Sequence, residues 1–137
     1  MHKNDFKKIT KKLFHDINKP IINAYMVIST CYKLMNKLSS NGLNDLLSEQ
    51  FTELRRITQK QSLKLENIYD VLNQQETKYL ESTYKRYTSQ FSFLNDLITN
   101  NNFDNLLSEE LINKLSSIDK ENTKFALNII KSINDDV

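Results

Sequence analysis

The scarcity of glycine and proline constrains this chain more than any other feature of its sequence. The 137 residues contain one glycine, Gly42, and one proline, Pro20. A protein built of strands needs turn residues about every ten positions, and glycine and proline supply many of the tight turns. The chain is therefore predicted to be all-α, with a few long helices joined by few turns. Its length allows a single buried core.

Apolar residues recur with a period close to 3.6, which predicts where the helices lie. Residues 5–39 read as one long helix that is kinked at Pro20, because the period resumes in phase beyond the proline. A second helix is expected over residues 44–73. Residues 39–42 form the turn of a long antiparallel hairpin, with Gly42 capping the first helix. Further C-terminal helices are expected after a joint at 73–77 and a loop at 100–105, with a candidate break at Ser116 and Ser117.

Charge and cysteine content narrow the functional classes. The 19 basic and 17 acidic residues give a net charge of +2, so the field of the whole protein is weak. Nucleic-acid binding is not expected, because it usually shows as a strong basic excess or patch. No signal-type segment or apolar run of membrane-span length is recognised. The single cysteine, Cys31, cannot form an intramolecular disulfide, so we expect a cytoplasmic protein that does not bind membranes.

His15 is the residue that the sequence marks as a candidate functional group. It lies two positions from both Leu13 and Ile17, about 200° of helical rotation from each, and is therefore expected on an exposed face. Asp16 follows it directly and is a candidate acid, base or orienting group. No metal site is expected, since no second histidine or cysteine lies at ligand spacing. A glycine-rich phosphate loop is excluded by the single glycine.

The segment around His15 resembles the H-box of sensor histidine kinases. In that box a histidine is followed by an acid, an aliphatic residue, two variable positions, a proline and an aliphatic residue. The corresponding segment here is Phe14-His15-Asp16-Ile17-Asn18-Lys19-Pro20-Ile21. Residues 57–73 resemble the second helix of the dimerisation and histidine-phosphotransfer domain of the same family. The resemblance covers residues 1–75 and leaves 76–137 as a helical C-terminal extension.

This resemblance implies a fold and a reaction. Two copies of the hairpin would associate into a four-helix bundle, so a homodimer is expected. His15 would be the phosphoacceptor that exchanges a phosphoryl group with an aspartate of a response-regulator receiver domain. Asp16 would match the family's acid, and Pro20 the proline that bends the helix. The receiver would supply Mg²⁺, so the chain itself is expected to bind no cofactor. It would dock over the facing part of the second helix and over Lys19, Ile22, Asn23 and Met26.

Two departures from the family pattern narrow this expectation. Residues 76–137 contain no glycine, so they are not expected to form the family's glycine-rich ATP-binding domain, and we expect the phosphoryl group to come from another protein, a receiver or a histidine kinase. Family members that are also phosphatases carry Thr or Asn four positions beyond the histidine, where this chain has Lys19. We interpret the chain as a phosphotransferase similar in kind to the sporulation-type phosphorelay protein. Two alternatives stay open: a non-catalytic module that sequesters a response regulator or kinase, and a structural helical bundle.

Overall fold

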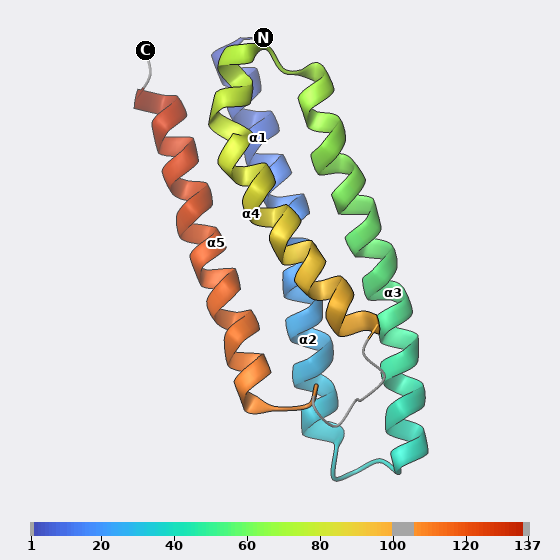
Figure 1. The fold of residues 1–137 in the computed structure, drawn as a ribbon. Helices are drawn as coiled ribbons and strands as arrows, with labels where there is room; N and C mark the ends of the chain where they lie inside the picture. Colours follow the sequence, from blue (N-terminus) through green and yellow to red (C-terminus); the bar gives the residue numbers. More distant parts are fainter. Residues whose placement is uncertain (1, 100–105, 136–137) are drawn as a thin grey trace.

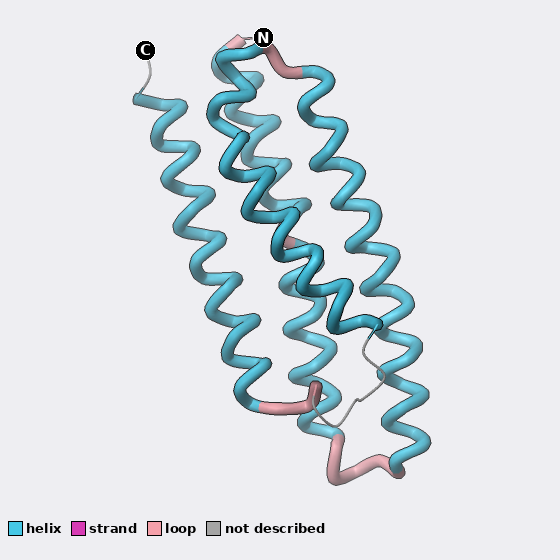
Figure 2. Tube along the Cα trace, viewed as in Figure 1, coloured by secondary structure: helices cyan, strands magenta, loops and turns pink. Residues whose placement is uncertain are grey.

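The computed structural model describes residues 2–99 and 106–135. The helices are α1 (Lys3–Ile17), α2 (Lys19–Leu34), α3 (Ser40–Asn67), the short 3-10 helix η1 (Ile68–Val71), α4 (Gln74–Thr99) and α5 (Glu109–Asp135). These described ranges contain no strand (Figure 2), so the all-α prediction is confirmed. None of the helices in them has an apolar segment long enough to cross a membrane.

The helices form a four-helix bundle in which α1 and α2 follow one another as a single interrupted column (Figure 1). α3 returns beside this column and completes the predicted hairpin. α4 packs chiefly against α3, and α5 packs against α2 and α1. α4 and α5 therefore complete a four-helix bundle within one chain. The expected homodimer stays a prediction.

One hydrophobic core extends along the bundle and is shared by residues on both sides of position 75. Phe14 of α1 packs against Tyr87 of α4 and edge-on against Phe125 of α5, with ring centroids 6.3 and 6.1 Å away. Aliphatic residues from all five α-helices are at most 1% exposed: Leu13, Ile17, Ile21, Ile28, Leu47, Leu54, Leu80, Leu94 and Leu115. The hairpin and the C-terminal helices are thus stabilised by the same core.

The long N-terminal helix is interrupted at Asn18. Pro20 has no N–H and cannot donate to the carbonyl of Asp16, four residues earlier. Around this gap the Asn18 N–H donates to Phe14 O at 3.3 Å, and the Ile22 N–H donates to Asn18 O at 3.2 Å. The expected kinked helix is therefore present as two helices placed end to end, α1 and α2.

Gly42 does not have the role predicted for it. We expected it to cap the end of the first helix in a left-handed conformation, but no described residue has a positive φ. Ser39 instead caps the start of α3, where its hydroxyl accepts a hydrogen bond from the Gly42 N–H at 3.0 Å. Gly42 thus lies in the first turn of α3. The prediction was wrong because the serine, a strongly preferred N-cap residue, determines where the helix begins.

Capping also explains where α4 begins. Asn73 caps α4: its side chain accepts from the Glu76 N–H at 2.8 Å, and the Glu76 side chain accepts from the Asn73 N–H at 3.1 Å. This reciprocal pair starts a helix within the segment expected to be a joint. α5 continues unbroken through Ser116 and Ser117. The loop expected at 100–105 lies outside the described residues.

Candidate functional site

His15 is exposed on the last turn of α1, as the sequence predicted. Its neighbours Phe14 and Asp16 are buried, so the imidazole lies on the outer side of the helix. His15 and Ile22 line two grooves, one on each side of the α1–α2 column. We call them the α3 groove and the α5 groove, after the helix that forms the opposite wall. The two residues therefore form a ridge between the grooves.

The α3 groove has a volume of about 470 Å³ and contains all four residues predicted to dock a partner. Ile22 and Met26 present apolar surface, being 41% and 59% exposed. Three cations contribute charge, but two of them are paired: Lys19 lies 3.3 Å from Asp16, and Arg56 Nε donates to Glu53 at 3.0 Å. The residues that line the groove with His15 are Lys19, Ile22, Asn23 and Met26 from α2, and Arg56, Ile57, Lys60 and Gln61 from α3.

Two side chains in the α3 groove carry buried oxygens without a hydrogen-bond partner. Gln61 is 5% exposed, and neither its Oε1 nor Asn23 Oδ1 accepts a hydrogen bond within the described part of the chain. A buried acceptor that is left unsatisfied costs about 1–3 kcal/mol. Gln61 is a polar residue among the mostly apolar buried side chains of α3, and it lines the groove together with the α2 residues that were predicted to dock a partner.

Asp16 is buried between α1 and α3 and is engaged by two lysines. Lys64 Nζ of α3 donates to Asp16 Oδ2, and Lys19 Nζ lies 3.3 Å from Oδ1. Burial by itself would raise the pKa of Asp16, but the hydrogen bonds and charges of Lys64 and Lys19 lower that pKa below its usual value. Asp16 therefore links α1 to α3 as a carboxylate. No contact described for this site connects it to His15, so a role as acid or base for the histidine stays a prediction.

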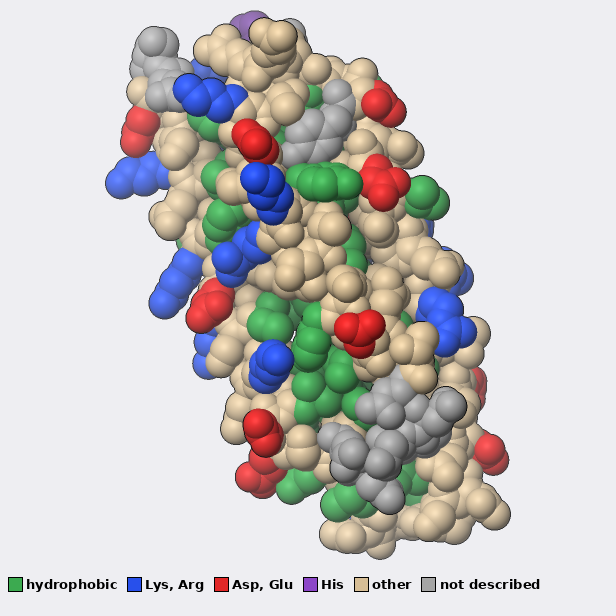
Figure 3. Space-filling model, viewed as in Figure 1, with side chains coloured by type: hydrophobic (Ala, Val, Ile, Leu, Met, Phe, Trp, Pro, Cys, Tyr) green, Lys and Arg blue, Asp and Glu red, His purple; other side chains and the backbone are tan. Residues whose placement is uncertain are grey.

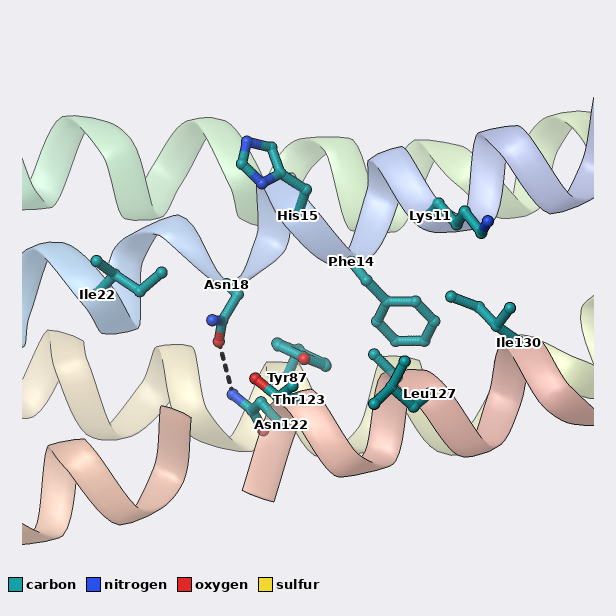
Figure 4. A pocket seen from close by; sticks show the side chains of 11 residues that line it. Lys11, Phe14, His15, Asn18, Ile22, Tyr87, Asn122, Thr123, Leu127 and Ile130 are labelled. Carbon is teal, nitrogen blue, oxygen red and sulfur yellow. Dashed lines mark hydrogen bonds between the residues drawn. The ribbon is translucent and has the colours of Figure 1, made fainter. Parts of the chain in front are cut away.

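A buried polar network holds the break between α1 and α2 from the other side. Asn122 of α5, 1% exposed, donates through Nδ2 to Asn18 Oδ1 at 2.9 Å (Figure 4) and to Gln90 Oε1 at 2.8 Å. Asn122 Oδ1 accepts from Arg86 Nε at 2.9 Å and from Gln90 Nε2 at 2.8 Å. Asn18 Nδ2 in turn donates to Asp119 Oδ1 at 2.7 Å. The residue at the break is thus bonded to two positions of α5.

The α5 groove, of about 380 Å³, lies above this network and is mainly apolar. Phe14, Leu127 and Ile130 project toward one another across it, while Lys11 points outward (Figure 4). Acidic and basic side chains are interspersed over the face of the bundle seen in Figure 3, in keeping with the small net charge. Sequence reasoning identified neither this groove nor the network, because both depend on α5.

Within the described residues, no group of three or more His, Cys, Asp and Glu side chains is arranged to hold a metal ion. Comparisons with models of protein families, with curated proteins and with solved structures find no match to this chain. The chemistry of the site is therefore argued from its own geometry. The site consists of the exposed imidazole of His15 on the ridge, the cationic and apolar α3 groove beside this imidazole, and the buried contacts that hold the turn at Asn18 from both sides.

Proposed function

We propose that the protein is a histidine phosphotransferase of a two-component phosphorelay, and that His15 exchanges a phosphoryl group with an aspartate of a response-regulator receiver domain. The observation that carries this proposal is the α3 groove. It contains the exposed His15 together with Lys19, Ile22, Asn23 and Met26, the residues that the H-box resemblance implies for docking. A phosphoacceptor has to be accessible and close to the surface that binds its partner. The exposure of His15 and its place in the proposed docking groove support this role.

The reaction needs little from the chain beyond a positioned imidazole. A ring nitrogen of neutral His15 attacks the phosphorus of the receiver's aspartyl phosphate, the N–P bond forms, and the P–O bond to the aspartate breaks. The aspartate leaves as a carboxylate, and the proton on the other ring nitrogen passes to solvent. Mg²⁺ held by the receiver would neutralise charge on the phosphoryl oxygens. The return reaction follows the same path in reverse.

The composition of the α3 groove supports an acidic partner. Lys60 has no ion-pair partner in the described part of the chain, so it is available to the acidic pocket in which a receiver holds its metal. Lys19 is paired with Asp16, but its side chain is 51% exposed and adds positive charge at the same groove. The side chains of Ile22 and Met26 offer apolar anchors.

The same groove would also serve a module that binds a receiver without catalysis, and the position of Asp16 favours keeping this second candidate. The carboxylate is engaged by Lys64 and Lys19, and within the described residues no hydrogen bond or ion pair joins it to His15. The two candidates differ in one property: only the phosphotransferase needs the imidazole of His15.

The decisive experiment incubates the protein with radiolabelled phosphorylated receivers and measures protein-bound phosphate that is labile to acid and stable to base. We expect labelling of the wild type, none of His15→Ala, and wild-type labelling of His2→Ala, which removes the other histidine of the chain. Receiver binding by calorimetry should be retained in His15→Ala. If no receiver labels the wild type, the phosphotransfer proposal is wrong, and retained binding would then identify a sequestering module.

A further inference from the structure

We infer that Asn122 is a positioning residue for His15, which gives the C-terminal helices a role in the proposed transfer. The inference rests on the proposed function, because it concerns the rate at which His15 reacts. It also assigns a role to α5, because Asn122 lies on this helix, far from His15 in the sequence. The argument depends on how the break between α1 and α2 is held.

The turn that carries His15 is short of backbone hydrogen bonds. It lies at the end of α1, and Pro20 leaves the carbonyl of Asp16 without its helical donor. The bonds that bridge the break, at 3.3 Å to Phe14 O and 3.2 Å to Asn18 O, are at or beyond the long end of the usual range for N–H···O contacts. Side chains from neighbouring helices must therefore fix this turn.

α5 supplies that restraint through Asn18, one helical turn beyond His15. The Asn18 amide is used at both ends: its oxygen accepts from Asn122 at 2.9 Å, and its nitrogen donates to Asp119 at 2.7 Å. Asp119 and Asn122 are three residues apart and so lie on one face of α5. On the opposite side of the ridge, Lys64 of α3 holds Asp16. His15 thus lies between two residues that are anchored to different helices.

Asn122 is itself fixed in orientation, which makes it suitable for this role. Gln90 forms two hydrogen bonds with its amide, and Arg86 forms a third. The Arg86 guanidinium lies 4.8 Å from the centroid of the Phe125 ring, which holds that arginine against α5. Because the Asn122 amide is buried and all its hydrogen-bonding positions are used, it fixes Asn18 relative to α4 and α5. Reaction rates are sensitive to such placement, because a displacement of about 1 Å can cost about a hundredfold in rate.

The test compares variants that break the bond to Asn18 with one that loosens α5 elsewhere. Asn122→Ala removes the bond, and Asn122→Asp keeps the acceptors for Arg86 and Gln90 but cannot donate to Asn18. The matched control is Ile133→Val, a core residue of α5 that is 3% exposed and distant from the break. We expect both Asn122 variants to lower the transfer rate within the receiver complex about tenfold or more. The receiver Kd should change less than about twofold in all three variants, because the α3 groove does not include Asn122.

A second measurement does not depend on phosphotransfer. Amide hydrogen exchange at Ile22, which bonds to Asn18 O across the break, should accelerate in Asn122→Ala and Asn122→Asp but not in Ile133→Val. If the wild type accepts no phosphate, the proposed function is wrong and this exchange experiment alone decides whether Asn122 holds the turn. If Asn122→Ala does not fold, Asn122→Asp and Asn18→Ala remove the same bond. Transfer at the wild-type rate, or a loss no larger than that of Ile133→Val, would overturn the inference.

Discussion

Replacing Lys64 by methionine should destabilise the fold more than replacing Asp16 by asparagine, although the two residues belong to the same ion pair. The reason is their unequal burial: the Asp16 side chain is 9% exposed and that of Lys64 is 39% exposed. Lys64→Met leaves a buried carboxylate with Lys19 as its only cation. Asp16→Asn leaves two lysines that can turn toward water. An ion that is left buried costs more than one that can be hydrated.

The magnitudes follow from this difference. Removing one partner of a fully buried pair costs about 3–5 kcal/mol, and Lys19 remains 3.3 Å from Asp16, so we expect about 2–3 kcal/mol for Lys64→Met. Asp16→Asn loses charge-assisted hydrogen bonds to lysines that are partly hydrated, and should cost about 1–1.5 kcal/mol. The double variant should show a coupling energy of about 1–2 kcal/mol. Lys60→Met, on the exposed side of α3, is the control and should change stability by less than about 0.5 kcal/mol.

Urea unfolding followed by circular dichroism measures these differences in the free energy of unfolding. Repeating the measurement at several pH values shows in which direction the stabilisation by this pair changes with pH. The folded protein lowers the pKa of Asp16, so the stabilisation is present above the unfolded pKa of about 3.9 and is lost as the pH falls through the folded pKa. The gap between the wild type and Asp16→Asn should therefore narrow in acid. Equal costs for the two single variants with no coupling energy would refute the assignment of this pair.

Three further outcomes test the helix boundaries and the core. Ser39→Ala removes the N-cap of α3 and should cost about 1 kcal/mol in urea unfolding, whereas Ser40→Ala, one residue later, should not. Gly42→Ala should change the same free energy by less than about 1 kcal/mol, because helix propensity favours alanine while its Cβ would lie 3.2 Å from Ser39 Oγ. A larger loss of stability would indicate that Gly42 caps the preceding helix in a left-handed conformation after all. Cys31 is 1% exposed and burial raises the pKa of its thiol, so iodoacetamide should label it only on unfolding, and rapid labelling of the folded protein would contradict this core.

Local sequence periodicity was sufficient to predict the features that depend on one helix alone. The scarcity of turn residues predicted long helices, and the rotation of His15 away from Leu13 and Ile17 predicted its exposure. The four residues that the H-box resemblance implied for docking, Lys19, Ile22, Asn23 and Met26, lie at helical spacing on α2 and line one groove. For the same reason the interruption near Pro20 was recognisable from the proline itself.

Features that depend on how two helices are aligned were not predictable from those patterns. Lys64 meets Asp16 from 48 residues away, and Asn122 meets Asn18 from 104 residues away. Such pairs require the rotation and axial offset of each helix, which hydrophobic periodicity leaves undetermined. The turn before α3 was misplaced for a different reason, because asparagine and glycine occur at both kinds of helix end. The side-chain oxygen of Ser39 was the signal that identified the end correctly.

The ridge formed by His15 and Ile22 has a consequence for the order of events in a relay. Both residues line the α3 groove and the α5 groove. A protein bound in one groove would therefore block access to the imidazole from the other groove. In the proposed relay, a donor and an acceptor of the phosphoryl group would therefore be unable to engage His15 together. Each would bind and leave in turn, with the phosphorylated chain as a free intermediate between them. Steady-state measurements of such a relay would follow ping-pong kinetics, with parallel lines in double-reciprocal plots.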